Sequence, residues 1–277
     1  PLEEIDLVLF INGLPFATLE LKNPWTGQNA RYHGQKQYKQ DRDTGQPLLQ
    51  FGRCLVHMTV DTDEVYMTTK LAGAATFFLP FNKGHNHGAG NPPNPSGHKS
   101  AYLWQEVFSR ESVANIIQHF VRLDGSSKTP LAKRTLFFPR YHQLDVVRRL
   151  VAHASQHGVG QRYLIQHSAG SGKTNSIAWT AHFLADLHDD KNQKLFSSVL
   201  VVSDRNVLDA QLQEAIFDFE RTAGVVATIS SEQGSKSGQL TQALKDGKKI
   251  IVCTIQTFPF ALQQVQELAA TEGKRFA

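Results

Sequence analysis

Residues 167–174, HSAGSGKT, form the most specific chemical pattern in the sequence. A glycine-rich turn between a strand and a helix directs consecutive backbone N–H groups at one phosphate, and the positive end of the helix dipole lies at the same place. We therefore expect Lys173 to contact the β- and γ-phosphates of a nucleotide and Thr174 to ligate Mg²⁺. The other expected contacts come from Ser168, Ala169, Gly170, Ser171 and Gly172.

A second pattern combines two carboxylates with a lysine, namely Asp6 and the triplet Glu20-Leu21-Lys22. Side chains alternate between the faces of a strand, so we expect Glu20 and Lys22 on one face and Leu21 in the core. Two carboxylates can hold a hard cation such as Mg²⁺, which polarises a scissile phosphate and activates water, and Lys22 can stabilise the developing charge. By itself, the pattern also fits a strand that carries charges for solubility.

The spacing of these residues constrains the hairpin that would join them. The Asn-Gly pair at 12–13 is a strong hairpin signal,. With a plain two-residue turn, Asp6 would lie opposite Leu19, and Glu20 would face the wrong side. The site therefore needs one extra residue or a bulge, which we expect near residues 14–15.

The elements around the two patterns divide the chain into two parts. The first part reads as a hairpin at 5–22, a helix at 29–41, strands at 54–60, 64–71 and 75–81, a loop at 83–99 and a helix at 100–123. The second part reads as strands at 163–166, 197–203 and 249–255 with helices at 175–188 and 205–219. This alternation predicts a parallel sheet with helices on both faces. We expect a nuclease domain at 1–123, a linker at 124–134 and a motor domain at 135–277.

The carboxylates and lysine lie in a longer segment, DLVLFINGLPFATLELKNP, that resembles the PD-(D/E)-x-K nuclease segment of type I restriction enzyme motor subunits. In that family, a hairpin with N-G-L-P precedes E-L-K-N-P. The resemblance places Asp6, Glu20 and Lys22 on the catalytic positions of the family, and one earlier acidic residue would precede Pro1. It implies a restriction-endonuclease-like α/β core.

Two further segments resemble the nucleotide-binding parts of the same family. Residues 140–143, RYHQ, resemble its R-Y-x-Q segment, in which the glutamine, here Gln143, reads the adenine edge. HSAGSGKT resembles its Walker A loop. The strict loop pattern has glycine where His167 stands, and motor ATPases of helicase superfamily 2 often lack that glycine. The resemblance therefore implies a RecA-like P-loop domain.

Two segments nearer the end of the chain resemble the parts of this motor that follow the DNA. Asp204 and Arg205 begin a D-R-x-x-L-x-x-Q segment, and Thr254 and Gln256 belong to a T-I-Q segment. Together the resemblances imply an ATP-dependent DNA translocase and Mg²⁺-dependent endonuclease that acts on double-stranded DNA. They also imply separate methylation and specificity subunits as partners, a bacterial or archaeal cytoplasm and no membrane.

The sequence departs from the family in two respects. Nucleases of this kind often carry a Q-x-x-x-Y helix, but Gln35 and Tyr38 are only three residues apart. No Walker B motif and no second motor domain with an arginine finger precede Ala277. We therefore expect a segment of a longer protein, which by itself binds ATP poorly and hydrolyses it little.

Two other classes of protein share parts of this pattern. A stand-alone superfamily 2 helicase or a type III restriction subunit would carry the same motor, although a type III enzyme usually places its nuclease after it. A nucleotide-binding scaffold without nuclease chemistry would carry the phosphate loop alone. In such a scaffold Asp6, Glu20 and Lys22 would not converge.

The bulk composition is that of an ordinary globular protein, with 277 residues, 40% hydrophobic residues and a net charge of +4. Two distant cysteines exclude a disulfide scaffold and a zinc ribbon,. The histidines of the 83–99 loop are expected in solvent. Lys36, Lys39 and Arg42 form either a DNA-backbone contact or a solvated helix face. Trp104 and Phe108, at helical spacing, and Trp179 are expected to pack in the interior.

Overall fold

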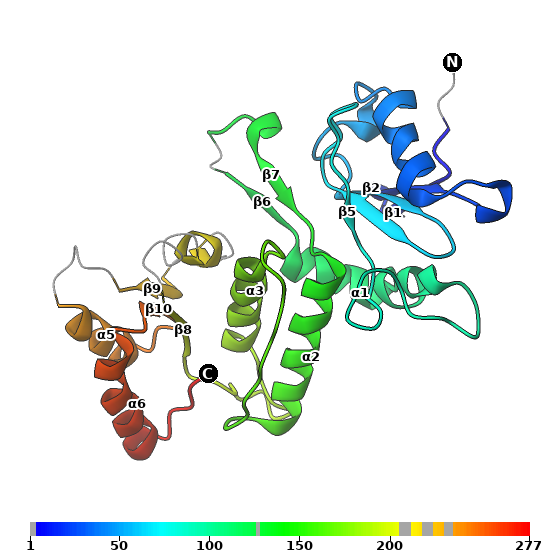
Figure 1. Ribbon diagram of the computed structural model, residues 1–277. Coiled ribbons are helices and arrows are strands. Elements are labelled where there is room, and N and C mark those ends of the chain that lie inside the picture. The colour runs from blue at the N-terminus through cyan, green and yellow to red at the C-terminus, as the bar shows by residue number, and fades with distance from the viewer. Residues whose placement is uncertain (1–3, 126–127, 205–211, 218–223, 230–234) are drawn as a thin grey trace. The chain divides into compact units, whose positions relative to one another are not determined.

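The computed structural model describes residues 4–125, 128–204, 212–217, 224–229 and 235–277 (Figure 1). The chain forms two compact units, Pro1–His142 and Gln143–Ala277. The division falls within helix α2 (Tyr141–His157), eight residues after the start of the second domain that the sequence suggested. In the described residues, no helix has the length and apolar character needed to cross a membrane.

The first unit is built on a mixed sheet with the strand order β1-β2-β3-β4-β5. Its strands are β1 (Leu7–Ile11), β2 (Leu14–Leu21), β3 (Val56–Val60), β4 (Val65–Thr68) and β5 (Leu79–Pro80). β2 and β3 are parallel, and the other neighbours are antiparallel. A parallel pair needs a crossover connection. The segment that follows β2 provides it, and the expected α/β class is confirmed for this unit.

A helix on one face of the sheet fills this crossover (Figure 1, blue). It consists of two π-helical turns, η2 (Ala30–Gly34) and η3 (Gln37–Asp41). The helix begins where the Asn29 side chain accepts a hydrogen bond from the Tyr32 N–H at 2.8 Å. The Asp61 carboxylate at the end of β3 accepts another from the Ala30 N–H at 2.8 Å. These acceptors satisfy backbone donors that the first helical turn leaves free.

The second helical region of this unit is divided rather than continuous. It comprises η6 (Leu103–Val107), α1 (Arg110–Asn115) and η7 (Ile116–Phe120). The expected single helix is interrupted because Ser109 is extended and its side chain caps α1 by accepting from the Ser112 N–H. Phe108 at the interruption contacts Phe16 edge-on, with ring centroids 5.8 Å apart.

The segment at 124–134 differs from a simple linker. It joins β6 (Arg122–Asp124) to β7 (Thr135–Phe137), which pair antiparallel. The two strands on either side of this segment pair with each other, and both belong to the first unit. The short helical turns of the unit are η1 (Pro24–Thr26), η4 (Pro47–Leu49), η5 (Lys99–Ala101) and η8 (Leu131–Lys133).

The second unit contains a parallel sheet with the order β8-β10-β9, as the alternating pattern predicted. Its strands are β8 (Val199–Ser203), β9 (Val226–Thr228) and β10 (Ile250–Thr254). Its helices after α2 are α3 (Lys173–Ala185), α5 (Lys236–Lys245) and α6 (Phe258–Glu272), with residues 212–217 also helical. The rest of the helix expected at 205–219 lies outside the described residues.

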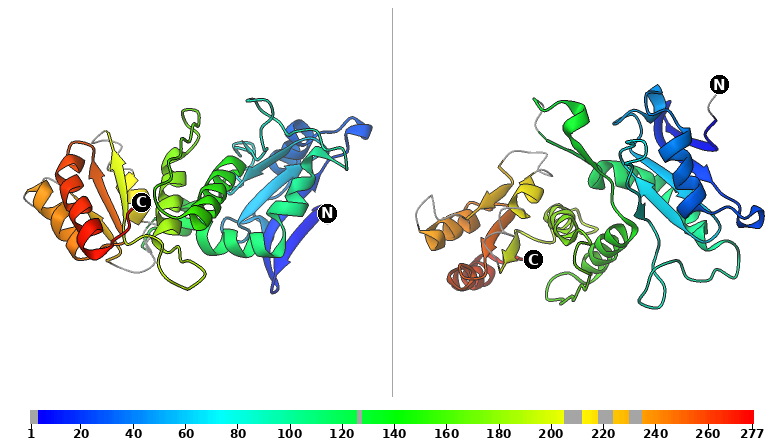
Figure 2. Two further views of the ribbon diagram at one scale, coloured as in Figure 1. Left: turned by 90° about the horizontal axis from the view of Figure 1, so that it is seen from below. Right: turned by 45° about the horizontal axis from the view of Figure 1, so that its top comes forward.

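Alternation along β10 divides the core of this unit into two layers (Figure 2). Ile250 and Val252 pack with α3 on one face of the sheet. Ile251 and Cys253 pack with α5 and α6 on the other face. Strand side chains point to alternate faces, and β10 is fully buried on both. Trp179 of α3 is 1% exposed, as expected for interior packing.

The strand expected at residues 163–166 does not form. Leu164 is 94% exposed. The edge of β8 opposite β10 is already hydrogen-bonded, because the Leu200 N–H donates to the Ala277 carbonyl at 2.8 Å and the Ala277 N–H donates to the Ser198 carbonyl at 3.1 Å. A strand at 163–166 would need a free strand edge to hydrogen-bond its backbone groups, and this edge of β8 is occupied,. The prediction from residue type alone was therefore wrong here.

Candidate functional site

The hairpin of β1 and β2 contains the irregularity that the sequence predicted. The turn has two residues, but the register shifts between Leu9, which pairs with Ala17, and Phe10, which pairs with Pro15. Phe16 is therefore the extra residue of a β-bulge, directly after the expected position. Leu7 pairs with Leu19, so one further step places Asp6 opposite Glu20.

The bulge brings the two carboxylates and the lysine together. The Lys22 Nζ lies 3.5 Å from Asp6 Oδ2 and 3.7 Å from Glu20 Oε2. It also donates a hydrogen bond to the Leu21 carbonyl at 3.0 Å. Asp6 Oδ2 accepts a 2.7 Å hydrogen bond from the Leu21 N–H, which fixes the Asp6 carboxylate against β2. All three predicted side chains thus converge on one face of the hairpin.

Glu20 is the most deeply buried of the three groups, with no exposed surface. Its Oε1 accepts hydrogen bonds from Arg42 Nε at 2.8 Å and Nη2 at 2.6 Å. Its Oε2 is buried without a hydrogen-bond partner. Burial raises the pKa of Glu20 above its ordinary value, and the Arg42 guanidinium opposes this shift. The site therefore combines one hydrogen-bonded carboxylate oxygen with one that has no hydrogen bond and faces the Lys22 ammonium group at 3.7 Å.

The helix at 30–41 can approach this site closely because of Gly34. A Cβ at position 34 would lie 2.8 Å from Thr59 Cβ and 3.6 Å from Lys22 Cγ. Only glycine permits the helix axis to lie this near β3 and the lysine. Four residues further on, the buried Tyr38 hydroxyl is 2.7 Å from Thr18 Oγ1, on the same face of β2 as Glu20.

Thr18 Oγ1 also lies 2.7 Å from Nδ1 of the buried His57. Burial lowers the pKa of His57 from its ordinary value to about 4. The unfolded chain therefore binds more protons than the fold between pH 6.5 and about 4, and the free energy of unfolding falls as the pH drops through this window,.

From pH 7.5 to pH 4.5 the loss attributable to His57 should be about 2.5 kcal/mol. Native-state hydrogen exchange of β2 and β3 amides measures the stability of the first unit by itself. A His57→Gln variant should lose about 2.5 kcal/mol less than the wild type over the same pH interval. Equal losses in the two proteins would contradict a neutral buried His57.

The phosphate loop ends at the first residue of α3. Gly172 is the residue before the helix and has φ 79°, in the left-handed region that favours glycine. The loop is closed by Lys173, whose Nζ donates to the carbonyls of Ser168 at 2.8 Å and His167 at 3.1 Å. The helix N-terminus and the lysine thus lie together, as phosphate binding requires. Residues 169–170 form a turn, and the predicted loop then leads directly into α3 at Lys173.

Gln143 of α2 reaches the same loop. Its Nε2 donates to the Gly172 carbonyl at 3.0 Å and lies 3.3 Å from the Ser171 carbonyl. The side chain is nearly buried, at 4% exposure. The residue expected to read an adenine edge is therefore anchored on the loop that would hold the phosphates of the same nucleotide.

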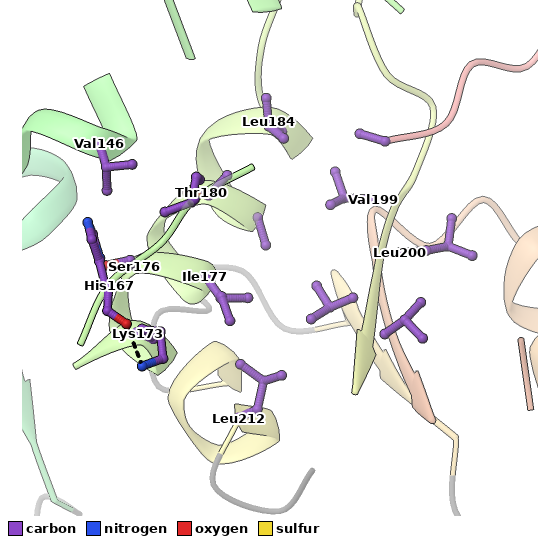
Figure 3. A pocket seen from close by; sticks show the side chains of 15 residues that line it. Val146, His167, Lys173, Ser176, Ile177, Thr180, Leu184, Val199, Leu200 and Leu212 are labelled. Atoms are coloured by element: carbon purple, nitrogen blue, oxygen red, sulfur yellow. Dashed lines mark hydrogen bonds between the residues drawn. The ribbon is translucent and has the colours of Figure 1, made fainter. Parts of the chain in front are cut away.

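Beside the loop, a cavity of about 390 Å³ lies between α3 and β8 (Figure 3). His167 and Lys173 are at one end, and apolar side chains line the rest, among them Ile177, Leu184 and Leu200. An apolar lining with few polar groups does not suit a triphosphate. The phosphates are therefore better placed on the loop itself.

Of the expected DNA contacts, Asp204 and Thr254 lie at the carboxyl ends of neighbouring parallel strands. Asp204 directly follows β8 and is exposed, and Arg205 lies outside the described residues. Thr254 ends β10 and is buried, with its hydroxyl 3.0 Å from that of Thr257. Gln256, two residues later, is exposed. Ligands of parallel sheets bind at this edge, where Thr254 shapes the turn that presents Gln256.

Two family models match the chain. Residues 2–76 match the type I restriction enzyme R protein N terminus, and residues 142–275 match the SWI2/SNF2 ATPase. Curated relatives matching along both parts are named as type I restriction enzyme endonuclease subunits. In both parts the chain is therefore similar to type I restriction enzyme R subunits. The first model covers the carboxylates and the lysine, and the second covers the phosphate loop.

The curated relatives of this chain come from bacteria and archaea. The SsaAORF53P endonuclease subunit of Staphylococcus saprophyticus is 24% identical over 265 residues, which is 95% of this chain and 25% of that protein. The HindI endonuclease subunit of Haemophilus influenzae is 24% identical over 217 residues, covering 75% of this chain and 19% of that protein. The putative MjaVIIIP endonuclease subunit of Methanocaldococcus jannaschii is 23% identical over 224 residues, which is 76% of this chain and 19% of that protein. The chain thus spans about a quarter of the length of the first of these relatives.

Several predictions from the sequence about which side chains are buried were wrong. Leu21 is 41% exposed rather than in the core, because it lies at the end of β2. Trp104, within η6, is 40% exposed, whereas Phe108 does contact Phe16. Arg42 was assigned to a solvated face or to DNA, but its side chain is only 11% exposed and bonds Glu20.

Three histidines, Tyr38 and Gln35 were also singled out in the sequence. The histidines of the 83–99 loop are exposed: His85, His87 and His98. Tyr38 packs in the core, while Gln35 lies 3.5 Å from Lys39 through its amide oxygen. Arg42 contacts Glu20 because it lies just after the helix that crosses over Lys22, and sequence spacing alone does not reveal this position.

Proposed function

We propose that this chain contributes the nuclease centre and the nucleotide-binding loop of an enzyme that translocates double-stranded DNA with ATP and cleaves it with Mg²⁺. The observation that carries the nuclease part is the convergence of Asp6, Glu20 and Lys22, with Lys22 Nζ at 3.5 and 3.7 Å from the two carboxylates. A scaffold without nuclease chemistry gives no reason for a buried glutamate with an unpaired oxygen at this place.

The residues present fit a divalent cation. Carboxylate oxygens are the ligands that Mg²⁺ prefers, and it is commonly bound by one or two carboxylates together with water and substrate phosphate. Among the described residues no cluster of three or more histidine, cysteine, aspartate or glutamate side chains forms. In this proposal Asp6 and Glu20, which both lie within 4 Å of Lys22 Nζ, would supply the protein ligands. When bound, the ion supplies charge neutralisation of the phosphate and a water of lowered pKa.

Lys22 has a distinct part in this proposal. Its side chain is 6% exposed, and its ammonium group lies between the two carboxylates. A cation fixed at this position can hold the attacking water and stabilise the extra negative charge of the pentacoordinate phosphate. Because the Leu21 carbonyl also accepts from Nζ, the ammonium group is oriented before substrate arrives.

The second unit supports ATP binding in the same protein. The backbone of residues 168–172 and the amino end of α3 are arranged to receive phosphates, with Lys173 closing the loop and Thr174 as the proposed ligand of Mg²⁺. Gln143 would read the adenine edge from its anchored position beside the loop. Asp204, Arg205, Thr254 and Gln256 would line the path of DNA at the carboxyl edge of the sheet.

The partners follow from the family. As an R subunit, the complete protein would act with methylation and specificity subunits in the cytoplasm of a bacterium or archaeon. A stand-alone superfamily 2 helicase and a type III subunit are less favoured, because the match to the R-protein N terminus precedes the match to the ATPase along the chain.

Supercoiled plasmid cleavage by the full-length subunit, assembled with its methylation and specificity partners, tests the proposal. We expect linear product only when ATP and Mg²⁺ are both present, together with DNA-stimulated ATP hydrolysis. Cleavage that persists in the presence of EDTA would contradict the metal centre. Cleavage without ATP would contradict the coupling of the nuclease to a motor.

A further inference from the structure

Arg42 binds the carboxylate of Glu20 in an asymmetric manner. Both Nε and Nη2 donate to the same oxygen, Oε1, at 2.8 and 2.6 Å. The other oxygen, Oε2, is buried and accepts no hydrogen bond. A guanidinium group usually pairs its two donors with both oxygens of a carboxylate. Here the two donors saturate one oxygen, and the second remains available.

The backbone around Arg42 holds this geometry in place. The helix ends at Asp41, and Arg42 is extended, with its N–H donating to the Gln37 carbonyl at 3.0 Å. Gly34 keeps the same helix against Thr59 and Lys22. The guanidinium is therefore delivered to Glu20 from a fixed point rather than from a mobile surface segment.

Lys22 does not duplicate this contact. Its Nζ lies 3.7 Å from Glu20 Oε2, beyond hydrogen-bond distance, and donates instead to the Leu21 carbonyl. On the other carboxylate, Asp6 Oδ2 is held by the Leu21 N–H. Each carboxylate thus has one oxygen held by the protein, and Arg42 provides this anchor for Glu20.

We propose that Arg42 is a positioning residue of the metal centre, which anchors Oε1 of Glu20 so that Oε2 serves as a monodentate ligand of the divalent cation. This inference rests on the proposed nuclease function. It assigns to Arg42 a role outside the Asp6, Glu20 and Lys22 set. Outer partners of metal ligands fix the ligand orientation, and their loss typically weakens metal affinity by about 10- to 100-fold.

Electron paramagnetic resonance of free Mn²⁺ measures metal affinity without DNA, nucleotide or turnover. Titrations would use the full-length subunit carrying Arg42→Gln, Arg42→Lys or Glu20→Gln. Arg31→Gln, at an exposed position on the same helix, is the matched control. We expect Arg42→Gln to bind Mn²⁺ about 10- to 100-fold more weakly, Arg42→Lys to recover part of the affinity, and Arg31→Gln to match the wild type.

A cleavage assay on the assembled enzyme gives a second readout. The Mg²⁺ concentration for half-maximal cleavage should rise in Arg42→Gln by a similar factor, with much of the rate recovered at saturating Mg²⁺. A variant that merely folds poorly would lose rate at every Mg²⁺ concentration. Hydrogen exchange of the β2 and β3 amides checks that the first unit keeps its fold.

The Glu20→Gln arm separates the two proposals. If Glu20→Gln loses Mn²⁺ affinity while Arg42→Gln binds Mn²⁺ as tightly as the wild type or more tightly, the metal centre stands and the positioning role of Arg42 is wrong. If Glu20→Gln binds as well as the wild type, the metal centre and the inference built on it both fall.

Discussion

Lys22→Ala should reduce plasmid cleavage by the assembled enzyme at least about 100-fold while leaving DNA-stimulated ATP hydrolysis within twofold of the wild type. Removing one fixed group that stabilises transition-state charge commonly costs about 10²- to 10³-fold in rate. The Lys22 Nζ lies near both carboxylates, at 3.5 Å from Asp6 and 3.7 Å from Glu20. Agarose-gel cleavage kinetics and a phosphate-release assay on the same samples measure the two activities.

Lys133→Ala, at an exposed position in η8, is the matched control and should cleave normally. Lys22→Arg keeps the charge but replaces a compact ammonium group with a planar fork, so it should restore little activity. A Lys22→Ala enzyme that cuts at the normal rate would make the nuclease assignment wrong. The first unit would then serve another purpose beside the motor.

Lys173→Ala should abolish both activities, with ATP hydrolysis reduced at least about 100-fold. The lysine is the charged group of the loop that reaches the terminal phosphates, and such electrostatic contacts dominate phosphoryl transfer. In the structure its Nζ is held by the carbonyls of Ser168 and His167, at 2.8 and 3.1 Å. A phosphate would replace these acceptors. Under the proposed function, plasmid cleavage should be lost with the ATPase, because the nuclease would depend on translocation.

Lys245→Ala, at the exposed end of α5, is the control for charge removal in the second unit. Circular dichroism should separate a folding defect from a chemical one, because a folded Lys173→Ala protein keeps its secondary structure while losing affinity for a fluorescent nucleotide. ATP hydrolysis that survives in Lys173→Ala would contradict the phosphate loop. Cleavage that survives loss of hydrolysis would show that the nuclease acts without the motor.

The hairpin, the bulge and the parallel sheet could be predicted because each follows from local chemistry. Asn12-Gly13 specifies a two-residue turn, and the need to place Asp6 opposite Glu20 specifies the bulge,. The uninterrupted run of apolar residues at 250–253 specifies a strand that is buried on both faces,.

The features that could not be predicted depend on partners distant in sequence. Residues 163–166 have strand composition, but the backbone of Phe276 and Ala277 occupies the neighbouring edge of β8. Arg42 reads as a solvated cation until the crossover helix is seen to end beside Glu20. Whether a segment forms a strand depends on whether a free strand edge is nearby, and whether a cation is buried depends on whether a carboxylate is nearby. The strand propensity of the residues contains no information on either.

The bulge at Phe16 has a consequence for how this segment can change in evolution. Glu20 faces Asp6 only because β2 carries one residue more than β1 requires between the turn and the site. Gain or loss of a single residue between positions 7 and 19 would turn Glu20 and Lys22 to the opposite face, whatever the new residue. The length of the hairpin is therefore more constrained than most of its side chains, apart from the turn residues Asn12 and Gly13 and the site residues Asp6, Glu20 and Lys22. When related chains are compared, gaps belong outside residues 6–22.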